Sequence, residues 1–328
     1  FANPRTGQIL GADVMLEFSS LRRYQEVETI YDSSKLFAAS DSGHQGLYRQ
    51  LAFGLSALMA MGADARQQSA MVDDWLRSLV VHEVGHTLGL SHNMRASQYR
   101  PLSELHNRIE TGRSGVSASV MDYEATNVAP PGQPQGQYWS TVPGPYDDWA
   151  IDYGYSEALA DPVAEAARLQ AILGRSTEPQ LAFGNDADDM RAPGAGIDPR
   201  VMTFDMSSDA IGFAEQRLQL IQQLQGKLRE KLTRPGQSYQ GLSNAFGVLM
   251  VDERQNAAVL SRYVGGVQVD RALAGQAGAG TPFTPVPAAQ QRRAMAVLAK
   301  YVFAPDAMSV PTDLMTHLQN QRRSYYFY

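Results

Sequence analysis

The chain has 328 residues, no cysteine and a formal net charge of −6 at pH 7. Its length indicates two domains or one catalytic domain with a large appended subdomain, and 44% apolar residues are ample for a packed core. The composition excludes disulfides, thiolate metal ligands, a basic surface for nucleic acid and an apolar run that spans a bilayer, so any metal must be held by His, Asp or Glu.

The N-terminal residues indicate a turn followed by a strand. Asn3–Gly7 has the composition of a turn. In Gln8–Ser19, apolar and polar residues alternate with a period of two, as in Val14, Leu16 and Phe18. We therefore predict an edge strand with one face on a core. Two interpretations are open: an ordinary edge strand, or the edge of a substrate cleft to which an extended peptide adds as a further strand.

Helical segments follow this strand. Leu21–Tyr31 predicts a short helix or an irregular crossing, and Gly46–Met61 predicts an apolar helix that ends near Gly62. Ala65–Gly89 predicts a longer helix, which begins either at its first residue or at the pair Asp73–Asp74. Apolar residues recur every four positions in this helix and predict a stripe that faces the core: Val72, Leu76, Val80, Val84 and Leu88.

The end of the longer helix carries a metal-ligand spacing. His82 and His86 are four residues apart, so both imidazoles lie on one helix face and reach a single metal ion. Glu83 is turned about 100° round the helix from His82, which places its carboxylate beside the metal. Gly89 can adopt positive φ, end the helix and return His92 as a third ligand. Three protein ligands leave one position open, which is the arrangement of a catalytic zinc.

The alternative for these histidines is an amphipathic helix whose imidazoles are ordinary core or surface groups. The chain has six histidines, and three of them fall within eleven residues, which disfavours that alternative. We expect the others, His44, His106 and His317, to be surface groups. His106 is predicted as an exposed residue of the partly helical segment Ser97–Gly112 and not as a fourth ligand, because the site already has three protein ligands.

A loop-rich segment and a short helix complete the N-terminal half. Ser117–Tyr123 reads SASVMDY. Thr126–Pro145 is rich in Pro, Gly and Gln, which predicts a long ordered loop on the surface. Asp147–Tyr153 predicts a short helix closed by Gly154.

From Ser156 onward, the sequence predicts a helical subdomain without catalytic residues of its own. Helices are expected at Glu157–Leu173, Ala210–Leu232, Tyr239–Val264 and Pro287–Phe303, connectors at Met190–Arg200 and Ala272–Pro287, and a short strand at Val267–Val269. The second helix has an apolar stripe of Ala214, Leu218, Ile221, Leu224, Leu228 and Leu232. Asn185–Asp189 is an acidic cluster. We predict a solvated loop there and not the alternative, a calcium site, because the Gly and the later Glu of an EF-hand loop are lacking.

The zinc spacing and the segment after it resemble a known clan. H-E-x-x-H-x-x-G-x-x-H followed by a Met-containing turn is the signature of the metzincin zinc peptidases. Its positions here are His82, Glu83, His86, Gly89, His92 and Met121. The resemblance implies that Met121 forms an apolar floor under the imidazoles without binding the metal. It also implies that Tyr123 ligates the resting metal or stabilises the tetrahedral intermediate, as in astacin-like and serralysin-like members; the alternative is a packing tyrosine.

More narrowly, the segments NPRTGQILGADV, HEVGHTLGLSHN, SVMDY and PYDDWAIDYGY resemble bacterial metallopeptidases related to the toxin-associated EcxA. This resemblance implies an α+β, mostly helical fold, with a metzincin-like catalytic region at residues 1–155 and a helical C-terminal subdomain at 156–328. It also implies an exported bacterial protein with a further N-terminal domain. Phe1–Gly7 has no signal-peptide pattern, so we expect a piece of a longer precursor in which further strands of the sheet lie upstream.

We predict that the chain is a zinc-dependent metalloendopeptidase. Zn²⁺ held by the three histidines lowers the pKa of its bound water towards about 7. Glu83 takes the proton from this water as it attacks the scissile carbonyl, and passes it to the leaving amine. The expected partner is a protein or peptide substrate; nucleic acid and a membrane span are not expected, and the oligomeric state is left open. Asp122, Asp147 or Asp148 is expected to accept the outer N–H of a ligand histidine.

Two alternatives share this site. A latent zinc-binding scaffold, or a partner-binding module of an exported protein, would keep the fold and the metal without turnover, and the intact Glu83 argues against it. A zinc hydrolase of non-peptide amides would use the same residues.

Overall fold

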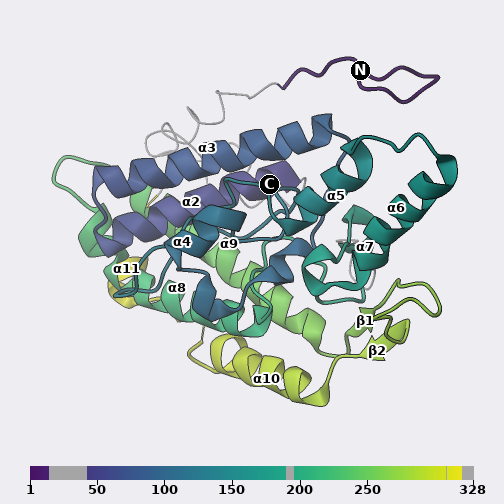
Figure 1. The fold of residues 1–328 in the computed structure, drawn as a ribbon. Coiled ribbons are helices and arrows are strands. Elements are labelled where there is room, and N and C mark those ends of the chain that lie inside the picture. Colours follow the sequence, from purple (N-terminus) through teal and green to yellow (C-terminus); the bar gives the residue numbers. More distant parts are fainter. Residues whose placement is uncertain (15–42, 190–195, 308, 320–328) are drawn as a thin grey trace.

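The computed structural model describes residues 1–14, 43–189, 196–307 and 309–319, and the fold is mostly helical with one small sheet (Figure 1). The α-helices are α2 (Gly43–Met61), α3 (Ala65–Thr87), α4 (Arg108–Ser114), α5 (Pro145–Tyr155), α6 (Pro162–Gly174), α7 (Asp186–Asp189), α8 (Ala210–Leu232), α9 (Gln240–Tyr263), α10 (Ala288–Leu298) and α11 (Thr312–Met315). Short helical turns are η2 (Ala96–Tyr99), η3 (Leu102–Glu104), η4 (Arg175–Thr177), η5 (Pro179–Leu181) and η6 (Ala299–Phe303). Strands β1 (Val267–Val269) and β2 (Phe283–Pro285) pair antiparallel, with Gln268 opposite Thr284. The predicted α+β, mostly helical class is confirmed.

The main hydrophobic core lies between α2, α3, α8 and α9. In Figure 1, α3 lies along α2, and α8 and α9 lie on the other side of α2. Fully buried side chains from all four helices meet there, among them Leu51, Trp75, Ile221 and Leu249. Burying one such aliphatic side chain contributes about 1.5–3 kcal/mol, so this core is a large part of the stability of the described fold. It draws on residues from both sides of position 155, and the two-domain division there stays a prediction.

A buried polar network connects this core to the loop between α4 and α5. Arg217 on α8 and Asp252 on α9 are nearly inaccessible, and their Nε and Oδ2 atoms are 3.7 Å apart. Gln50 on α2 donates to Asp252 (3.0 Å) and accepts from the backbone N–H of Thr126 (2.9 Å). Arg217 also donates to the carbonyl of Thr126. Buried charges are costly unless they are paired in this way, so the network fixes the loop against three helices.

The first fourteen residues contain the predicted turn but little strand. The turn at Pro4–Thr6 is confirmed, and Ala2 and Ile9 form an isolated antiparallel bridge across it. In the described part of the predicted strand, Gln8–Val14, only Ile9 has a bridge partner and every residue is exposed. Here the strand prediction is wrong, because alternation produces a strand only where a neighbouring strand supplies hydrogen bonds. The remainder of that strand and the segment Leu21–Tyr31 lie outside the described residues.

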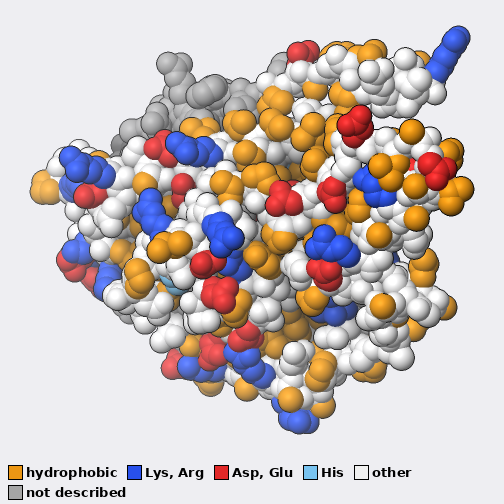
Figure 2. Space-filling view, viewed as in Figure 1, with side chains coloured by type: hydrophobic (Ala, Val, Ile, Leu, Met, Phe, Trp, Pro, Cys, Tyr) orange, Lys and Arg blue, Asp and Glu red, His pale blue; other side chains and the backbone are white. Residues whose placement is uncertain are grey.

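Helix α3 buries a different face from the predicted one. Of the two starts left open, the helix begins at Ala65: the side chain of Asp64 accepts from the N–H of Gln67, and the side chain of Gln67 accepts from the N–H of Asp64, a capping box. The face that is fully buried is formed by Met71, Trp75, His82 and Gly85. The predicted stripe is wrong for its C-terminal half, since Val80, Val84 and Leu88 are 38%, 42% and 39% exposed. Hydrophobic side chains accordingly gather on the surface over α3 in Figure 2. Because Trp75 and His82 occupy the interior, the face of α3 with Val80 and Val84 points towards solvent.

Most elements of the C-terminal half agree with the sequence. The helix Ala210–Leu232 is confirmed with both bounds, and five of its six stripe residues are buried. Helix α6 begins at Pro162, because Asp161 caps it and proline suits the first helical turn. The predicted helix Pro287–Phe303 divides into α10 and the π-helical turn η6, and the strand Val267–Val269 is confirmed. The predicted surface loop Thr126–Pro145 is exposed at residues 131–134, but Thr126–Ala129 and Tyr138–Ser140 are buried, so the prediction is wrong for those two stretches.

Candidate metal centre

The C-terminus of α3 turns the chain back in a Schellman motif. Gly89 has φ 88°, its N–H donates to the carbonyl of His86 (3.0 Å), and the N–H of Leu90 donates to the carbonyl of Gly85 (3.1 Å). The same turn places the carbonyl of Leu90 where it accepts a hydrogen bond from Nδ1 of His86 (2.9 Å). The glycine therefore ends the helix, redirects the chain towards His92 and supplies an acceptor that orients the second histidine.

Replacing this glycine is expected to weaken metal binding. Gly89→Ala puts a Cβ atom on a left-handed backbone, which costs about 1 kcal/mol and loosens the turn that orients His86. Gly132 is a matched control, because it has φ 86° and, like Gly89, open space around an added Cβ atom. Both alanine variants should lose similar free energy of unfolding in urea titrations, whereas only Gly89→Ala should lower zinc affinity in a chelator competition. Equal zinc affinities in the two variants would contradict this role of the turn.

Three imidazoles converge beside this turn. His82, His86 and His92 each offer a ring nitrogen, and these atoms all lie within 4.8 Å of one another. Nε2 of His86 and Nε2 of His92 are 3.1 Å apart. Two nitrogens bound to one tetrahedral zinc at its usual bond length are about 3.3 Å apart, so this pair already has the separation that a shared ion requires. The predicted ligand spacing thus produces a donor set suited to a metal that prefers nitrogen.

Nδ1 of each of these three rings has a hydrogen-bond acceptor. Nδ1 of His82 donates to the carbonyl of Val120 (2.8 Å), Nδ1 of His86 to that of Leu90, and Nδ1 of His92 to Oδ2 of Asp186 (2.7 Å). A carbonyl oxygen cannot donate, so Nδ1 carries the proton in the first two rings and Nε2 is left with its lone pair. These two rings are therefore in the tautomer that binds a metal through Nε2.

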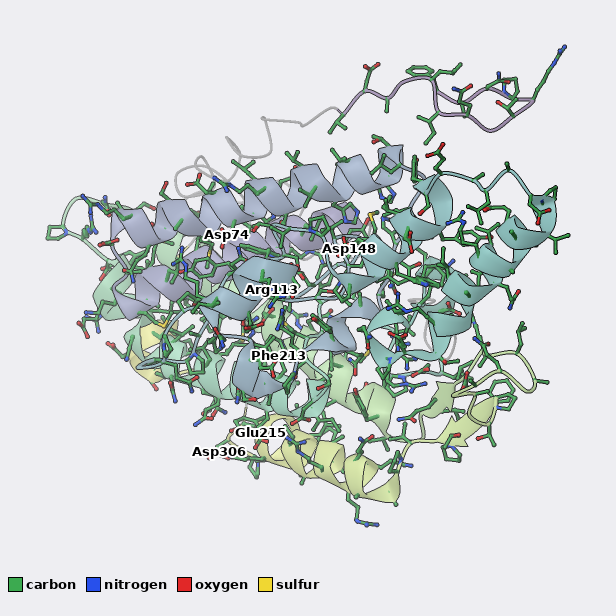
Figure 3. All side chains as sticks on the ribbon, viewed as in Figure 1. Asp74, Arg113, Asp148, Phe213, Glu215 and Asp306 are labelled. Atoms are coloured by element: carbon green, nitrogen blue, oxygen red, sulfur yellow. The ribbon has the colours of Figure 1, made fainter. Side chains whose placement is uncertain are left out.

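The acidic residues expected to hold the histidines do not contact them directly. Asp122 accepts from Ser117 (2.8 Å), and Asp147 accepts from the N–H of Val120 (2.9 Å). Asp148 is exposed on α5 (Figure 3). The expectation that one of these three accepts a ligand N–H is wrong, because backbone carbonyls and Asp186 occupy those positions.

Asp147 nevertheless orders the turn that contacts the metal centre. This carboxylate is buried and accepts from the N–H groups of Val120 and Gly144 (2.9 Å each) and from the hydroxyl of Ser119. Burial raises the pKa of Asp147, and these hydrogen bonds act in the opposite direction. The backbone packs closely here, since a Cβ atom on Gly144 would lie 2.1 Å from the carbonyl oxygen of Ala118. The carbonyl that orients His82 thus belongs to a turn held by one carboxylate.

Met121 packs directly under the ligand helix. It is fully buried, and a Cβ atom added to Gly85 would lie 2.3 Å from its sulfur. Gly85 lies between the first two ligand histidines, so the absence of a side chain there lets the thioether approach the helix backbone. The carbonyl of Met121 accepts from the N–H of Asn93 (2.9 Å), which joins the turn to the residue after the third ligand. Gly85 carries no signal in the sequence that distinguishes it from other helical glycines.

Tyr123 reaches the histidine cluster. Its hydroxyl lies 2.8 Å from Nε2 of His92, and its ring stacks on that of His82 with centroids 5.3 Å apart. The side chain is 2% exposed, so the phenol is held in place by its surroundings. Glu83 follows His82 on α3, is half-buried, and is not one of the residues in the group of mutually close ligand atoms. Tyr123 therefore contacts the third histidine of the cluster, and Glu83 is the neighbour of the first in the sequence; the catalytic roles of both stay predictions.

Two buried acidic residues share a cavity with the first histidine of the cluster. Asp122 and Glu124 line a small cavity together with His82 and Trp139. Burial raises the pKa of Glu124 to about 8, although the N–H and hydroxyl of Ser140 donate to its carboxyl group. Burial, together with the nearby acids Asp205 and Glu124, raises the pKa of Asp122 well above its ordinary value. With a pKa of about 8, Glu124 is mostly protonated at neutral pH, so it adds little negative charge next to the histidine cluster.

Two further expectations from the sequence need correction. His106 lies in a turn and is half-buried, and burial followed by the charge of Arg217 lowers its pKa to about 4; it is neither exposed nor helical. It is not part of the histidine cluster. The acidic cluster Asn185–Asp189 is partly helical, and its first aspartate contacts His92. The prediction of a simple solvated loop missed this role, because nothing local in the sequence connects Asp186 with a histidine 94 residues away.

Comparison with known proteins gives a family. A family model described as Met-zincin matches residues 64–327, which is most of the chain. No curated protein and no solved structure matches the sequence. Among the described helices, none has the length and apolar character needed to cross a membrane.

Proposed function

Because this chain belongs to the Met-zincin family, we propose that it is a zinc-dependent metalloendopeptidase that hydrolyses peptide bonds at the cluster of His82, His86 and His92. The observation that carries the proposal is the orientation of these rings. Every Nδ1 atom has a backbone or carboxylate acceptor, and the Nε2 atoms of His86 and His92 lie 3.1 Å apart. A set of three imidazoles at this separation suits zinc.

The residues beside the cluster have separate roles in the proposed reaction. A bound zinc would supply Lewis acidity, which polarises a carbonyl and acidifies water. Glu83 accepts the proton of the attacking water and returns it to the leaving amine, since it is adjacent to the ligands on α3 without being one of them. We assign to Tyr123, whose hydroxyl lies 2.8 Å from Nε2 of His92, a hydrogen bond to the oxyanion, and to Met121 the packing against α3 at Gly85.

Removal and return of the metal test the proposal. The full chain loaded with zinc is incubated with an unfolded protein substrate, with and without a chelator, and the fragments are identified by mass spectrometry. We expect internal cleavage that the chelator abolishes and zinc restores. Zinc bound at one ion per chain without cleavage would favour the latent scaffold. Cleavage of small non-peptide amides alone would favour the third candidate.

The proposal also covers where the protein is found. The four segments that resemble EcxA-related peptidases lead us to propose an exported bacterial enzyme. Fractionation of the source cells tests this: the protein should be found in the periplasm, the cell envelope or the medium, and its confinement to the cytosol would contradict export.

A further inference from the structure

The third ligand differs from the other two in its outer partner. His82 and His86 donate to neutral backbone carbonyls, whereas His92 donates to the carboxylate of Asp186, the first residue of α7. We propose that Asp186 is a positioning residue for His92, which fixes the ring and raises its affinity for the metal. This inference rests on the zinc site of the proposed function and assigns part of that site to the C-terminal half of the chain.

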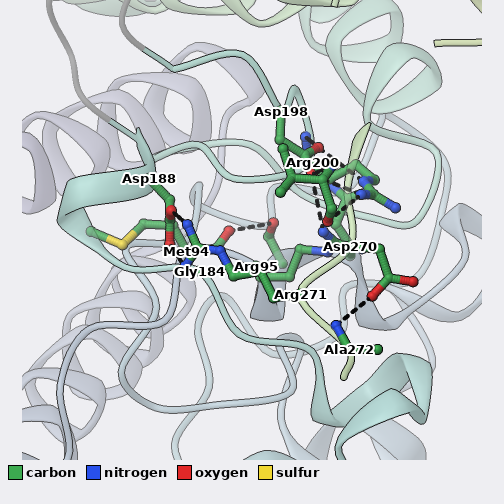
Figure 4. A network of polar contacts seen from close by, with 12 residues as sticks. Met94, Arg95, Gly184, Asp188, Asp198, Arg200, Asp270, Arg271 and Ala272 are labelled. Atoms are coloured by element: carbon green, nitrogen blue, oxygen red, sulfur yellow. Dashed lines mark hydrogen bonds and ion pairs between the residues drawn. The ribbon is translucent and has the colours of Figure 1, made fainter. Parts of the chain in front are cut away.

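Backbone pairing next to His92 brings Asp186 within reach. The N–H of Met94 donates to the carbonyl of Gly184 (2.8 Å), a contact in the network of Figure 4. Asn93 adds two hydrogen bonds from its side chain: its Nδ2 donates to the carbonyl of Ala182 (3.1 Å), and its Oδ1 accepts from the N–H of Gly184 (3.1 Å). Because the segment that follows His92 is paired with the segment that precedes Asp186, the two side chains meet across a fixed backbone geometry.

An ion pair holds α7 from its other side. Arg271 donates to both carboxylate oxygens of Asp188 (Figure 4). Asp188 also accepts from the N–H of Asn185 (3.1 Å), which closes the turn in front of Asp186. Its side chain is only 14% exposed, whereas that of Arg271 is 62% exposed. The acidic cluster is therefore anchored by an arginine that follows β1, and its first carboxylate is directed at the metal centre.

Loss of the Asp186 carboxylate should lower the affinity for the metal more than the stability of the fold. The side chain of Asp186 is 57% exposed, and even a charged pair at such an exposed position would contribute at most about 1 kcal/mol to folding. A carboxylate that accepts from a ligand histidine makes the imidazole a better electron donor and fixes its tautomer, and removing such a partner lowers metal affinity by about 10–100-fold. The two effects can be separated, because stability can be measured in the metal-free chain.

The test compares zinc affinity and metal-free stability in variants of the full chain. We expect Asp186→Ala to weaken zinc binding by about 10–100-fold in competition with a chromogenic chelator, and to change the metal-free free energy of unfolding by less than about 1 kcal/mol. Asp186→Asn should recover part of the affinity, since its amide oxygen still accepts from Nδ1 but carries no charge. Glu178→Ala is the matched control, because it removes a carboxylate from another exposed ion pair, with Arg175, and should leave zinc affinity unchanged.

A second variant tests the anchor. Arg271→Met frees Asp188 without touching the carboxylate that contacts the histidine, so zinc affinity should fall by no more than about fivefold, the equivalent of one exposed ion pair. The visible spectrum of the cobalt-substituted chain should change in Asp186→Ala and stay that of the wild type in Glu178→Ala.

Three results would overturn the inference. Wild-type zinc affinity in Asp186→Ala would overturn it alone and leave the proposed function standing. A loss of metal-free stability in that variant with unchanged zinc affinity would show a purely structural role. Failure of the wild-type chain to bind zinc would overturn both this inference and the proposed function.

Discussion

Glu83→Gln is expected to lower the rate of peptide cleavage by about 10²–10⁴-fold, the usual contribution of a positioned general base. Glutamine has nearly the same shape as glutamate but cannot accept a proton at neutral pH. Glu83 is half-buried on α3 and is separate from the three ligand nitrogens, so the substitution should leave the fold and the zinc content unchanged. The loss should therefore fall on kcat, with little change in KM.

Single-turnover cleavage of a fluorogenic peptide, with zinc content measured on the same samples, checks this expectation. Glu157→Gln is the control, since Glu157 is exposed and precedes α6. Cleavage by Glu83→Gln within threefold of the wild-type rate would remove Glu83 from the role of base. A variant without zinc would instead show that the carboxylate contributes to metal binding.

Asp147→Ala is expected to destabilise the chain by about 3–5 kcal/mol, because it leaves buried donors without an acceptor. The buried carboxylate of Asp147 accepts from two N–H groups and one hydroxyl, all in the turn before α5 or in the turn that contacts His82. The carbonyl of Val120 orients His82, so zinc affinity should fall together with the free energy of unfolding.

Urea unfolding with and without zinc measures both effects. Asp147→Asn keeps one acceptor oxygen and should recover part of the stability. Asp148→Ala serves as the control, since the neighbouring aspartate is exposed and its loss should cost less than about 0.5 kcal/mol. If Asp147→Ala has the same urea midpoint of unfolding as the wild type, the carboxylate does not stabilise this turn.

The histidine cluster and much of the helical fold could be predicted from the sequence, because they depend on local periodicity. An i, i+4 pair of histidines lies on one face of any α-helix, and a glycine that follows the helix is suited to the positive φ that redirects the chain. The bounds of α8 and its buried stripe were likewise readable from the 3.6-residue period and the proline after it.

Which face of a helix is buried depends instead on its neighbours. The aliphatic stripe of α3 satisfied the same periodicity, yet the structure buries Trp75 and His82 and leaves Val84 exposed. The polar composition of Thr126–Pro145 predicted a surface loop. Hydrogen bonds between Thr126 and the buried Arg217 and Gln50 make burial of its first residues possible.

The partners of the ligand histidines were decided only by tertiary structure. The sequence determined that His82, His86 and His92 can share a metal with Glu83 beside it. No local pattern in the sequence indicated that Val120 and Asp186 would accept hydrogen bonds from His82 and His92. None indicated that Met121 would pack against Gly85. Helical spacing is set within a few residues by the backbone itself, whereas a hydrogen-bond acceptor 94 residues away is set by how separate segments pack.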